Sequence, residues 1–554
     1  IAHARLVVLR LIGGAAYFQY GVDELTALCA NRRIPLVLLP GDTNPDPILQ
    51  ARSSVHPDDW TRLHQLFIAG GPANADTILR ALHRLALPGE GAVLANLAPA
   101  AFARFGLWYP GKGVTDQATI RAALCLPPGG KPAHIPILFY RAALEGAGTA
   151  TIEALIAALE AQGLAPVPIL VSSLKETACI AFVQQVLGAV APAAVLNLTG
   201  FALGIDGLDP AANPFATCDA PVIQLIQTGR SQGQWQADSQ GLSSKDMAMF
   251  LVMPEIDGRL AGLIVGHRAD ALWHERCQIP LTAYAPDPSG IARAASLAAS
   301  WSRLRATPRA DRKIALVLAN YPIRDGRLAN GVGYDAPEST IRMLQALESA
   351  GYGTSVGSLT AAALIDRLQS GPTNADPRRS ASPATLPLAR YATLFATLPE
   401  KIRAEVTARW GDPATDPFVQ GDAFHLPALI LGNLAVLIQP ARGYQLDETA
   451  SYHDPALVPP HAYLAAYLWL RHDFGAHALI HNGKHGTLEW LPGKATALDA
   501  TSYPDALWGQ LPHLYPFIVN DPGEGTQAKR RTGAVIIDHL VPPLTRAETY
   551  GPLK

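Results

Sequence analysis

The densest group of chemically versatile side chains lies between residues 481 and 494, in the segment HNGKHGTLEWLPGK. Its two histidines, His481 and His485, and the carboxylate of Glu489 could bind a divalent metal ion or transfer protons. Their i, i+4 spacing would align them on one helical face, although the Asn-Gly pair after His481 disfavours a helix there. The alternative is a surface turn with Glu489 in solvent.

A second group lies between residues 520 and 531, in the segment NDPGEGTQAKRR. If a helix begins at Thr526, Glu524 lies near its positive N-terminus and could be another metal ligand, while the basic residues could bind carboxylates of an anionic ligand. The alternative is an ordinary turn followed by a solvated basic helix face.

A third group occupies residues 320–333 and contains Arg324, Asp325 and Arg327. The two arginines could bind carboxylates, with Asp325 orienting either one. The alternative is an arginine–aspartate network that only holds a long loop. A weaker group of the same kind follows at residues 442–444.

Other familiar chemistries are not expected. Residues 106–112 have the spacing GxxxxGK, but Gly113 stands where a P-loop needs Ser or Thr. The chain has no HExxH motif and no GxSxG motif, which disfavours a zinc protease and an α/β-hydrolase. Its five cysteines form no CxxC pair, so we interpret them as buried small residues.

Each polar group follows an apolar stretch that predicts a strand. Because ligands bind beyond the carboxyl ends of parallel strands, these loops are the expected site. The pattern predicts strands at 6–11, 34–39, 135–140, 167–171, 194–198, 222–226, 313–320, 476–481 and 534–540, and helices from 22 and at 151–162, 338–350 and 461–472.

This alternation predicts a multidomain α/β fold of parallel-sheet βαβ units covered by helices. We expect an N-terminal α/β domain at 1–128, a second βαβ domain at 129–308, and a third at 309–554 that carries the polar loops. The stretch 371–387, rich in proline and small polar residues, is interpreted as a linker or an exposed insertion.

Composition excludes several classes of protein. Hydrophobic residues make up 49% and charged residues 16%, which is typical of a globular protein. Lys plus Arg number 44 against 46 Asp plus Glu, without long runs of one sign, so no nucleic-acid partner is expected. The apolar stretches are too short to cross a membrane. Without a signal-peptide pattern, a cytoplasmic location is expected.

Taken with the rest of the chain, the two densest segments resemble signatures of the large-subunit family of cobaltochelatase and magnesium chelatase. Further segments resemble the cobalt-type member in order, among them LIGGAAYFQYGVDEL, LANYPIRDGRLANGVG, QPARGYQLDETASYHDP and LPHLYPFIVNDPGEG. The magnesium-type signatures are closer to HGSLEFMPGKQ and NNPSEATIAKRR, so Trp490-Leu491 and residues 523–525 favour cobalt. Because family members are about twice as long, the chain is interpreted as an N-terminal half.

The resemblance implies a ligase that forms nitrogen–metal bonds, inserting Co²⁺ into hydrogenobyrinic acid a,c-diamide in aerobic cobalamin biosynthesis. It implies two AAA+ partner subunits that hydrolyse ATP, with no ATP bound to this chain. Under this hypothesis His485 and Glu489 are catalytic, because they receive the metal or accept ring protons. His481 and Glu524 are further metal ligands. The residues expected to contact the ring are Lys484, Trp490, Lys494, Tyr515, Asn520, Lys529, Arg530, Arg531, Arg324 and Arg327.

Three other functions remain open at this point. A magnesium or nickel chelatase of the same family would bind a different macrocycle. A non-catalytic tetrapyrrole-binding protein would have the same pocket without coupling to an ATPase. A periplasmic-type ligand-binding protein would share the βα units but rests on fold analogy alone.

Overall fold

The computed structural model describes residues 3–87, 89, 91–115, 132–204, 209–320, 323–331, 334–379, 382–444, 454–483, 486–518 and 522–539. The chain forms two compact units: Ile1–Gly106 with Arg141–Thr149, and Leu107–Tyr140 with Ala150–Lys554. The division into three domains at residues 128 and 308 stays a prediction. Within the described residues, no helix combines the length and apolar character needed to cross a membrane.

The smaller unit is built on one parallel crossover. Strands β1 (Val7–Leu11) and β2 (Leu36–Pro40) pair in parallel, with helix α1 (Gln19–Arg32) between them in the chain. Alternation along β2 turns Leu36 and Leu38 into one apolar core and Val37 and Leu39 into another. The βαβ unit predicted at the start of the chain is confirmed. Its helices α2 (Pro47–Ala51), α3 (Pro57–Ala69) and α4 (Pro72–Leu85) follow.

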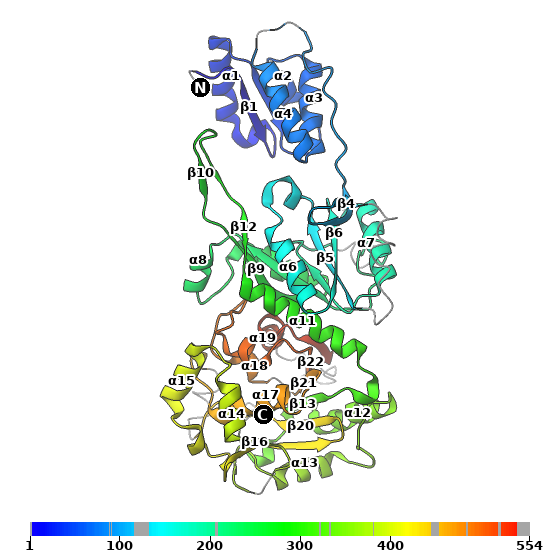
Figure 1. The fold of residues 1–554 in the computed structure, drawn as a ribbon, viewed down its shortest axis with the longest axis vertical. Helices are drawn as coiled ribbons and strands as arrows, with labels where there is room; N and C mark the ends of the chain where they lie inside the picture. The colour runs from blue at the N-terminus through cyan, green and yellow to red at the C-terminus, as the bar shows by residue number, and fades with distance from the viewer. Residues whose placement is uncertain are drawn as a thin grey trace, which may run out of the picture. The chain divides into compact units, whose positions relative to one another are not determined.

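The larger unit contains an eight-stranded sheet with the order β12-β9-β8-β7-β5-β6-β3-β4 (Figure 1). Its central pairs, β5–β6, β5–β7, β7–β8 and β8–β9, are all parallel, as predicted for a doubly wound sheet. The bounds are β3 (Phe105–Tyr109), β4 (Gly113–Thr115), β5 (His134–Tyr140), β6 (Ala165–Val171), β7 (Val195–Asn197), β8 (Val222–Thr228), β9 (Leu260–Arg268) and β12 (Tyr284–Pro286). The helices that connect or follow these strands are α6 (Ala150–Ala161), α7 (Thr177–Val190) and α11 (Pro288–Ala306).

The second large sheet carries the polar segments and has the order β19-β20-β13-β21-β22-β23. All its neighbours are parallel except β19–β20. The bounds are β13 (Ile314–Leu318), β19 (Ala428–Leu431), β20 (Leu434–Ile438), β21 (Ala478–Asn482), β22 (His513–Ile518) and β23 (Val535–His539).

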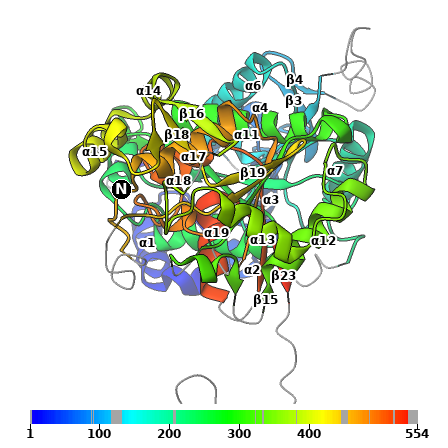
Figure 2. The same ribbon diagram turned by 90° about the horizontal axis from the view of Figure 1, so that it is seen from below.

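Helices cover both faces of this second sheet, as the view in Figure 2 shows. Helices α12 (Ala336–Ser349) and α13 (Ala361–Ser370) supply the core on one face, together with Leu316, Val436 and Ile438 of the sheet. Helix α17 (His461–His472) serves the other face and has the bounds that the sequence predicted. Helix α19 (Pro522–Thr532) connects β22 to β23 and begins before the predicted start at Thr526.

The proline-rich stretch 371–387, predicted to be a linker or an exposed insertion, is instead partly packed into the larger unit. Thr373, Ser382 and Ala384 are buried, and β16 (Thr385–Pro387) pairs with β18 (Ala423–His425). Ser382 Oγ donates to the Leu426 carbonyl at 2.5 Å, so hydrogen bonds replace the solvent contacts that such a composition usually favours. The linker interpretation was therefore wrong.

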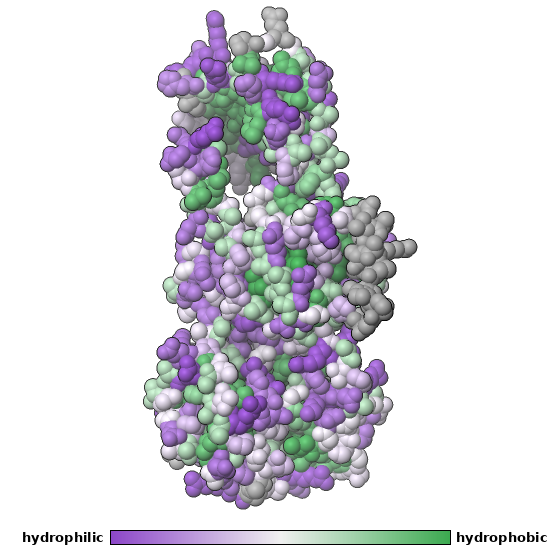
Figure 3. All heavy atoms as spheres, in the orientation of Figure 1, coloured by the Kyte–Doolittle hydropathy of each residue, from purple (hydrophilic) through white to green (hydrophobic). Residues whose placement is uncertain are grey.

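On the visible face in Figure 3, hydrophilic and hydrophobic residues are interspersed over the surface of the larger unit. The side chains at the heart of the HNGKHGTLEWLPGK segment, such as His481 and Glu489, are buried. Burial and hydrogen bonding, rather than surface composition, therefore identify the site.

Candidate functional site

Strand alternation gathers four polar side chains on the α17 face of the second sheet. On β21, Ile480 packs into the α12 core, so the next residue, His481, points to the opposite face. The same argument applies to His513 and Tyr515, which flank Leu514 on β22. Gln439 follows β20 directly and also faces α17.

Helix α17 meets these residues with two tyrosines one turn apart, Tyr463 and Tyr467. Gln439 Nε2 donates to the hydroxyl of Tyr467 at 3.2 Å and lies 3.4 Å from that of Tyr463. The Tyr463 hydroxyl also bonds Thr487 Oγ1 at 2.9 Å. The result is a buried polar layer between helix and sheet.

A continuous hydrogen-bond chain runs from α19 through this layer. Thr532 Oγ1 donates to the Ala528 carbonyl at 2.8 Å, so it accepts from His513 Nδ1 at 2.9 Å. His513 Nε2 then carries no proton and accepts from His481 Nδ1 at 2.8 Å. His481 Nε2 accepts in turn from the Tyr467 hydroxyl at 3.0 Å. One hydroxyl–carbonyl bond therefore sets the tautomers of both histidines.

Both histidines are neutral in this arrangement. Burial lowers the pKa of His513 to about 3, and burial together with the charge His513 would carry lowers the pKa of His481 well below its ordinary value. Both ring nitrogens of His481 are occupied by protein partners, so a metal ion there would have to displace Tyr467 or His513. The ligand role of His481 stays a prediction. In the structure this residue links Tyr467 to His513 by hydrogen bonds.

Glu489 lies in the short 3-10 turn η8 (Leu488–Trp490) and has no exposed surface. Its Oε1 accepts from the Tyr515 hydroxyl at 2.6 Å and from the Gly486 amide at 3.1 Å. The Gly486 amide also donates to the Tyr515 hydroxyl. The alternative of a solvated Glu489 is therefore wrong, and the carboxylate is held in one orientation by the strand residue Tyr515.

One buried arginine, Arg531, interacts with Glu489, and a second, Arg442, interacts electrostatically with Arg531. Arg531 donates to the carbonyls of Glu489 and, at 3.1 Å, Lys494. Burial lowers the pKa of Arg531 to about 10, the charge of Glu489 opposes that shift, and Arg442 adds to it. Arg442 is also buried and donates to the Asp454 carbonyl at 2.6 Å. At neutral pH the guanidinium of Arg531 is charged and partly offsets the buried carboxylate.

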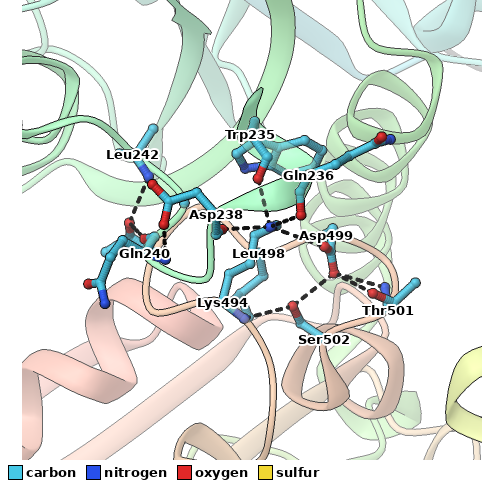
Figure 4. Close-up of polar contacts among 12 residues, drawn as sticks. Trp235, Gln236, Asp238, Gln240, Leu242, Lys494, Leu498, Asp499, Thr501 and Ser502 are labelled. Atoms are coloured by element: carbon cyan, nitrogen blue, oxygen red, sulfur yellow. Dashed lines mark hydrogen bonds and ion pairs between the residues drawn. The ribbon is translucent and has the colours of Figure 1, made fainter. Parts of the chain in front are cut away.

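Lys494, predicted to contact a ligand, instead joins the two sheets of the larger unit (Figure 4). Its Nζ donates to the carbonyls of Trp235 at 2.8 Å, Gln236 at 3.2 Å and Asp238 at 2.8 Å, and lies 3.8 Å from Asp499. Burial lowers the Lys494 pKa, and the nearby aspartates oppose that shift. The ammonium group already donates hydrogen bonds to three backbone carbonyls, so it would have to leave this position to contact a ligand.

The remaining basic residues differ in their surroundings. Arg530 forms a bidentate pair with Glu255 at 3.0 and 2.9 Å, which ties α19 to helix α10 (Met253–Ile256). Lys529, which precedes Arg530 in the chain, is half-buried. Trp490, which follows Glu489 in the chain, is also half-buried. Of the expected ring contacts, Tyr515 and Arg531 reach Glu489, whereas Arg530 and Lys494 are paired elsewhere.

Arg324 and Arg327 are exposed near the 3-10 turn η6 (Asp325–Arg327), beyond the carboxyl end of β13. Asp325 pairs with Arg379 at 2.5 Å, so the expectation that it orients a neighbouring arginine was wrong. Asp325 therefore belongs to an arginine–aspartate network, as in the alternative interpretation. Its partner is Arg379, which the sequence did not indicate.

Several predicted residues lie outside the described residues: Lys484, His485 and Asn520, and the side chain of Glu524. Their roles stay predictions. In the described part of the chain, no group of three or more His, Cys, Asp or Glu side chains has a geometry suited to a metal ion.

The sequence analysis missed Gln439, Tyr463, Tyr467 and His513. For three of them a signal was present: the tyrosines are four apart in a predicted helix, and His513 is two residues before Tyr515. Nothing in the sequence, however, showed that this helix packs on that strand.

Comparison with known proteins shows the family. The model described as CobN/Magnesium Chelatase matches residues 64–554. The aerobic cobaltochelatase subunit CobN of a Sinorhizobium species is 45% identical, with 100% of this chain and 43% of that protein aligned. A magnesium-chelatase subunit of Rhodobacter capsulatus is 29% identical, over 89% of this chain and 42% of that protein.

Among solved structures, the catalytic subunit of cobaltochelatase from Mycobacterium tuberculosis matches 99% of this chain and 45% of its own, with a TM-score of 0.74 and 35% identity. This chain therefore spans less than half the length of these relatives.

The Lys494 contacts predict a structural role. Replacing Lys494 with methionine keeps the apolar stem but removes a charged donor from three carbonyl oxygens. We expect the free energy of unfolding of the larger unit to fall by about 2 kcal/mol in urea titrations followed by tryptophan fluorescence. The control is Lys175→Met at an exposed lysine, expected to change it by less than about 0.5 kcal/mol. Equal stability of the two variants would contradict the role.

The neutral histidine pair predicts acid sensitivity. Because the folded pKa of His513, about 3, lies below the unfolded value of about 6.5, the stability it contributes is present above pH 6.5 and is lost as the pH falls toward 3. Between about pH 7.5 and pH 5 the loss from His513 alone is about 2 kcal/mol. We expect His513→Gln to lose correspondingly less over this range, whereas His274→Gln, at a half-exposed histidine, behaves like the parent. An unchanged acid dependence in His513→Gln would refute a buried neutral imidazole.

Proposed function

We propose that this chain, which belongs to the CobN/magnesium chelatase family, forms part of a cobaltochelatase large subunit and holds a corrinoid ring while Co²⁺ is inserted. The observation that carries the proposal is the likeness of the whole chain to an aerobic cobaltochelatase subunit, which is greater than its likeness to a magnesium-chelatase subunit. The protein would be a ligase that forms nitrogen–metal bonds, working in the cytoplasm.

The reaction assigns a role to the buried carboxylate of Glu489. As ring nitrogens bind the metal, their N–H protons must leave, and the metal must exchange its water for ring nitrogens. A carboxylate fixed by Tyr515 and the Gly486 amide could accept a ring proton or bind the incoming metal. Arg531 and Glu489 attract each other, and this attraction favours the ionised form of the buried carboxylate.

The expected partners of Glu489 keep their proposed roles. His485 would be the second metal ligand or proton acceptor, with Glu524 as a further ligand. Lys529 would face the carboxylates at the edge of the ring, and the half-buried Trp490 would line its apolar face. Two AAA+ partner subunits would hydrolyse ATP and drive the cycle.

Cobalt is assigned from relatives rather than from ligand chemistry. The donors described around Glu489 are oxygen atoms, which Mg²⁺ also accepts. The substrate, hydrogenobyrinic acid a,c-diamide, is therefore best tested through the macrocycle. We would titrate the full-length protein with this corrinoid and with protoporphyrin IX and record absorbance. Selective corrinoid binding supports the proposal, selective porphyrin binding moves the protein to the magnesium branch, and binding of neither contradicts both.

If Glu489 takes part in metal insertion but does not bind the ring, replacing it should impair Co²⁺ insertion and leave corrinoid binding intact. In the complete enzyme with its ATPase subunits, Glu489→Gln should reduce Co²⁺ insertion by on the order of a hundredfold or more while corrinoid affinity stays within about twofold. The matched control is Glu405→Gln, because Glu405 also accepts from a buried tyrosine, Tyr503, at 2.9 Å but lies apart from the polar layer. Normal turnover of Glu489→Gln would remove this residue from the mechanism.

A further inference from the structure

The side chain of Gln439 presents a buried acceptor that has no hydrogen-bond donor among the described residues. Gln439 is 2% exposed, and within the described part of the structure no group donates a hydrogen bond to its Oε1. A buried carbonyl oxygen without a donor is destabilising, because folding removes its hydrogen bonds to water without replacing them. Such an oxygen beside a layer of hydrogen-bonded side chains indicates a partner that binds during function.

The direction of this oxygen is set by the hydrogen-bond chain described above. The Tyr467 hydroxyl gives its only proton to His481 Nε2, so toward Gln439 it can only accept. The nitrogen of the Gln439 carboxamide must therefore face Tyr467, and Oε1 must face away from it. The orientation follows from the neutral tautomers of His481 and His513, and ultimately from Thr532.

The oxygen faces the same point as the Glu489 carboxylate. A Cβ atom placed on Gly486 would lie 3.2 Å from Gln439 Oε1, 3.2 Å from Glu489 Oε2 and 3.4 Å from the Tyr515 hydroxyl. Three oxygen atoms from β22, η8 and the end of β20 thus surround the position where any other residue would carry a side chain. Glycine at 486 leaves this position open.

We propose that Gln439 Oε1 is a metal-ligating atom that receives the divalent cation together with the carboxylate of Glu489. This inference rests on the proposed function and deepens it. A cation supplies what the amide oxygen lacks, because carboxylate and amide oxygens are both ligands of divalent ions. The neutral amide adds a ligand without adding negative charge, so the metal is held less tightly than by two carboxylates. A site that must pass its metal on to a ring benefits from that difference.

The test is a Co²⁺ titration of the full-length protein without corrinoid, followed by calorimetry and by the visible absorption of bound Co²⁺. We expect Gln439→Met, which has similar length but no oxygen, to weaken Co²⁺ binding by about tenfold or more. Gly486→Ala leaves every ligand in place and should also weaken binding, because its Cβ crowds both oxygens.

The matched control is Gln510→Met. Gln510 is buried, its Oε1 also has no hydrogen-bond donor in the described part, and its Nε2 donates to Asp505 at 2.7 Å. Its replacement should leave Co²⁺ affinity unchanged, which separates a ligand effect from the loss of a buried amide. Thermal unfolding of each variant reports whether it is folded.

Two failures are distinguishable. If Glu489→Gln abolishes Co²⁺ binding while Gln439→Met and Gly486→Ala bind as the parent does, the Gln439 inference is overturned and the proposed function stands. If Glu489→Gln also binds Co²⁺ normally, the metal lies elsewhere and the Gln439 inference is overturned. The proposed function is overturned separately, if the parent protein binds neither the corrinoid nor the porphyrin. Weak binding in Gln439→Met alone, with Gln510→Met unaffected, supports the inference even if Gly486→Ala fails to fold.

Discussion

The neutrality of two buried imidazoles governs the arrangement of the polar layer. His481 and His513 can each donate once and accept once only while uncharged, and burial enforces this by lowering both pKa values. A proton added to either ring would place two donors against each other in a medium of low dielectric. Tyr467, which hydrogen-bonds His481, depends on the same condition.

This layer and the carboxylate site are neighbours with different electrostatic properties. The layer around His481 consists of neutral groups whose protons are assigned, whereas Glu489 interacts with the charge of Arg531. The neutral groups of this layer do not titrate near neutral pH. They would therefore suit the proposed site, in which a metal ion replaces ring protons. Preorganised groups of this kind also need no rearrangement when charge moves.

The cations of the signature segments show why a motif is not by itself a ligand site. Lys494 and Arg531 were expected to face an anionic ring, yet both donate to backbone carbonyls. Lys494 binds the turn after β8, so the eight-stranded sheet and the loop that carries Glu489 are held together. The Arg530–Glu255 pair adds a second connection of this kind. Lys494, Arg530 and Arg531 therefore hold neighbouring elements in place around Glu489.

The sequence by itself determined the alternation of strands and helices, and with it the parallel sheets, because hydrophobic periodicity and turn residues are local properties. It also indicated Glu489 as a candidate site residue, because the position of this carboxylate between glycines and after an apolar strand can be read from the sequence alone. Only the tertiary structure decided that Gln439, Tyr467, His481 and His513 form one layer. These residues come from separate elements, and strand order and helix packing, which bring them together, depend on contacts far apart in the chain. The burial that makes the histidines neutral is a property of that packing, so it could not be predicted from spacing.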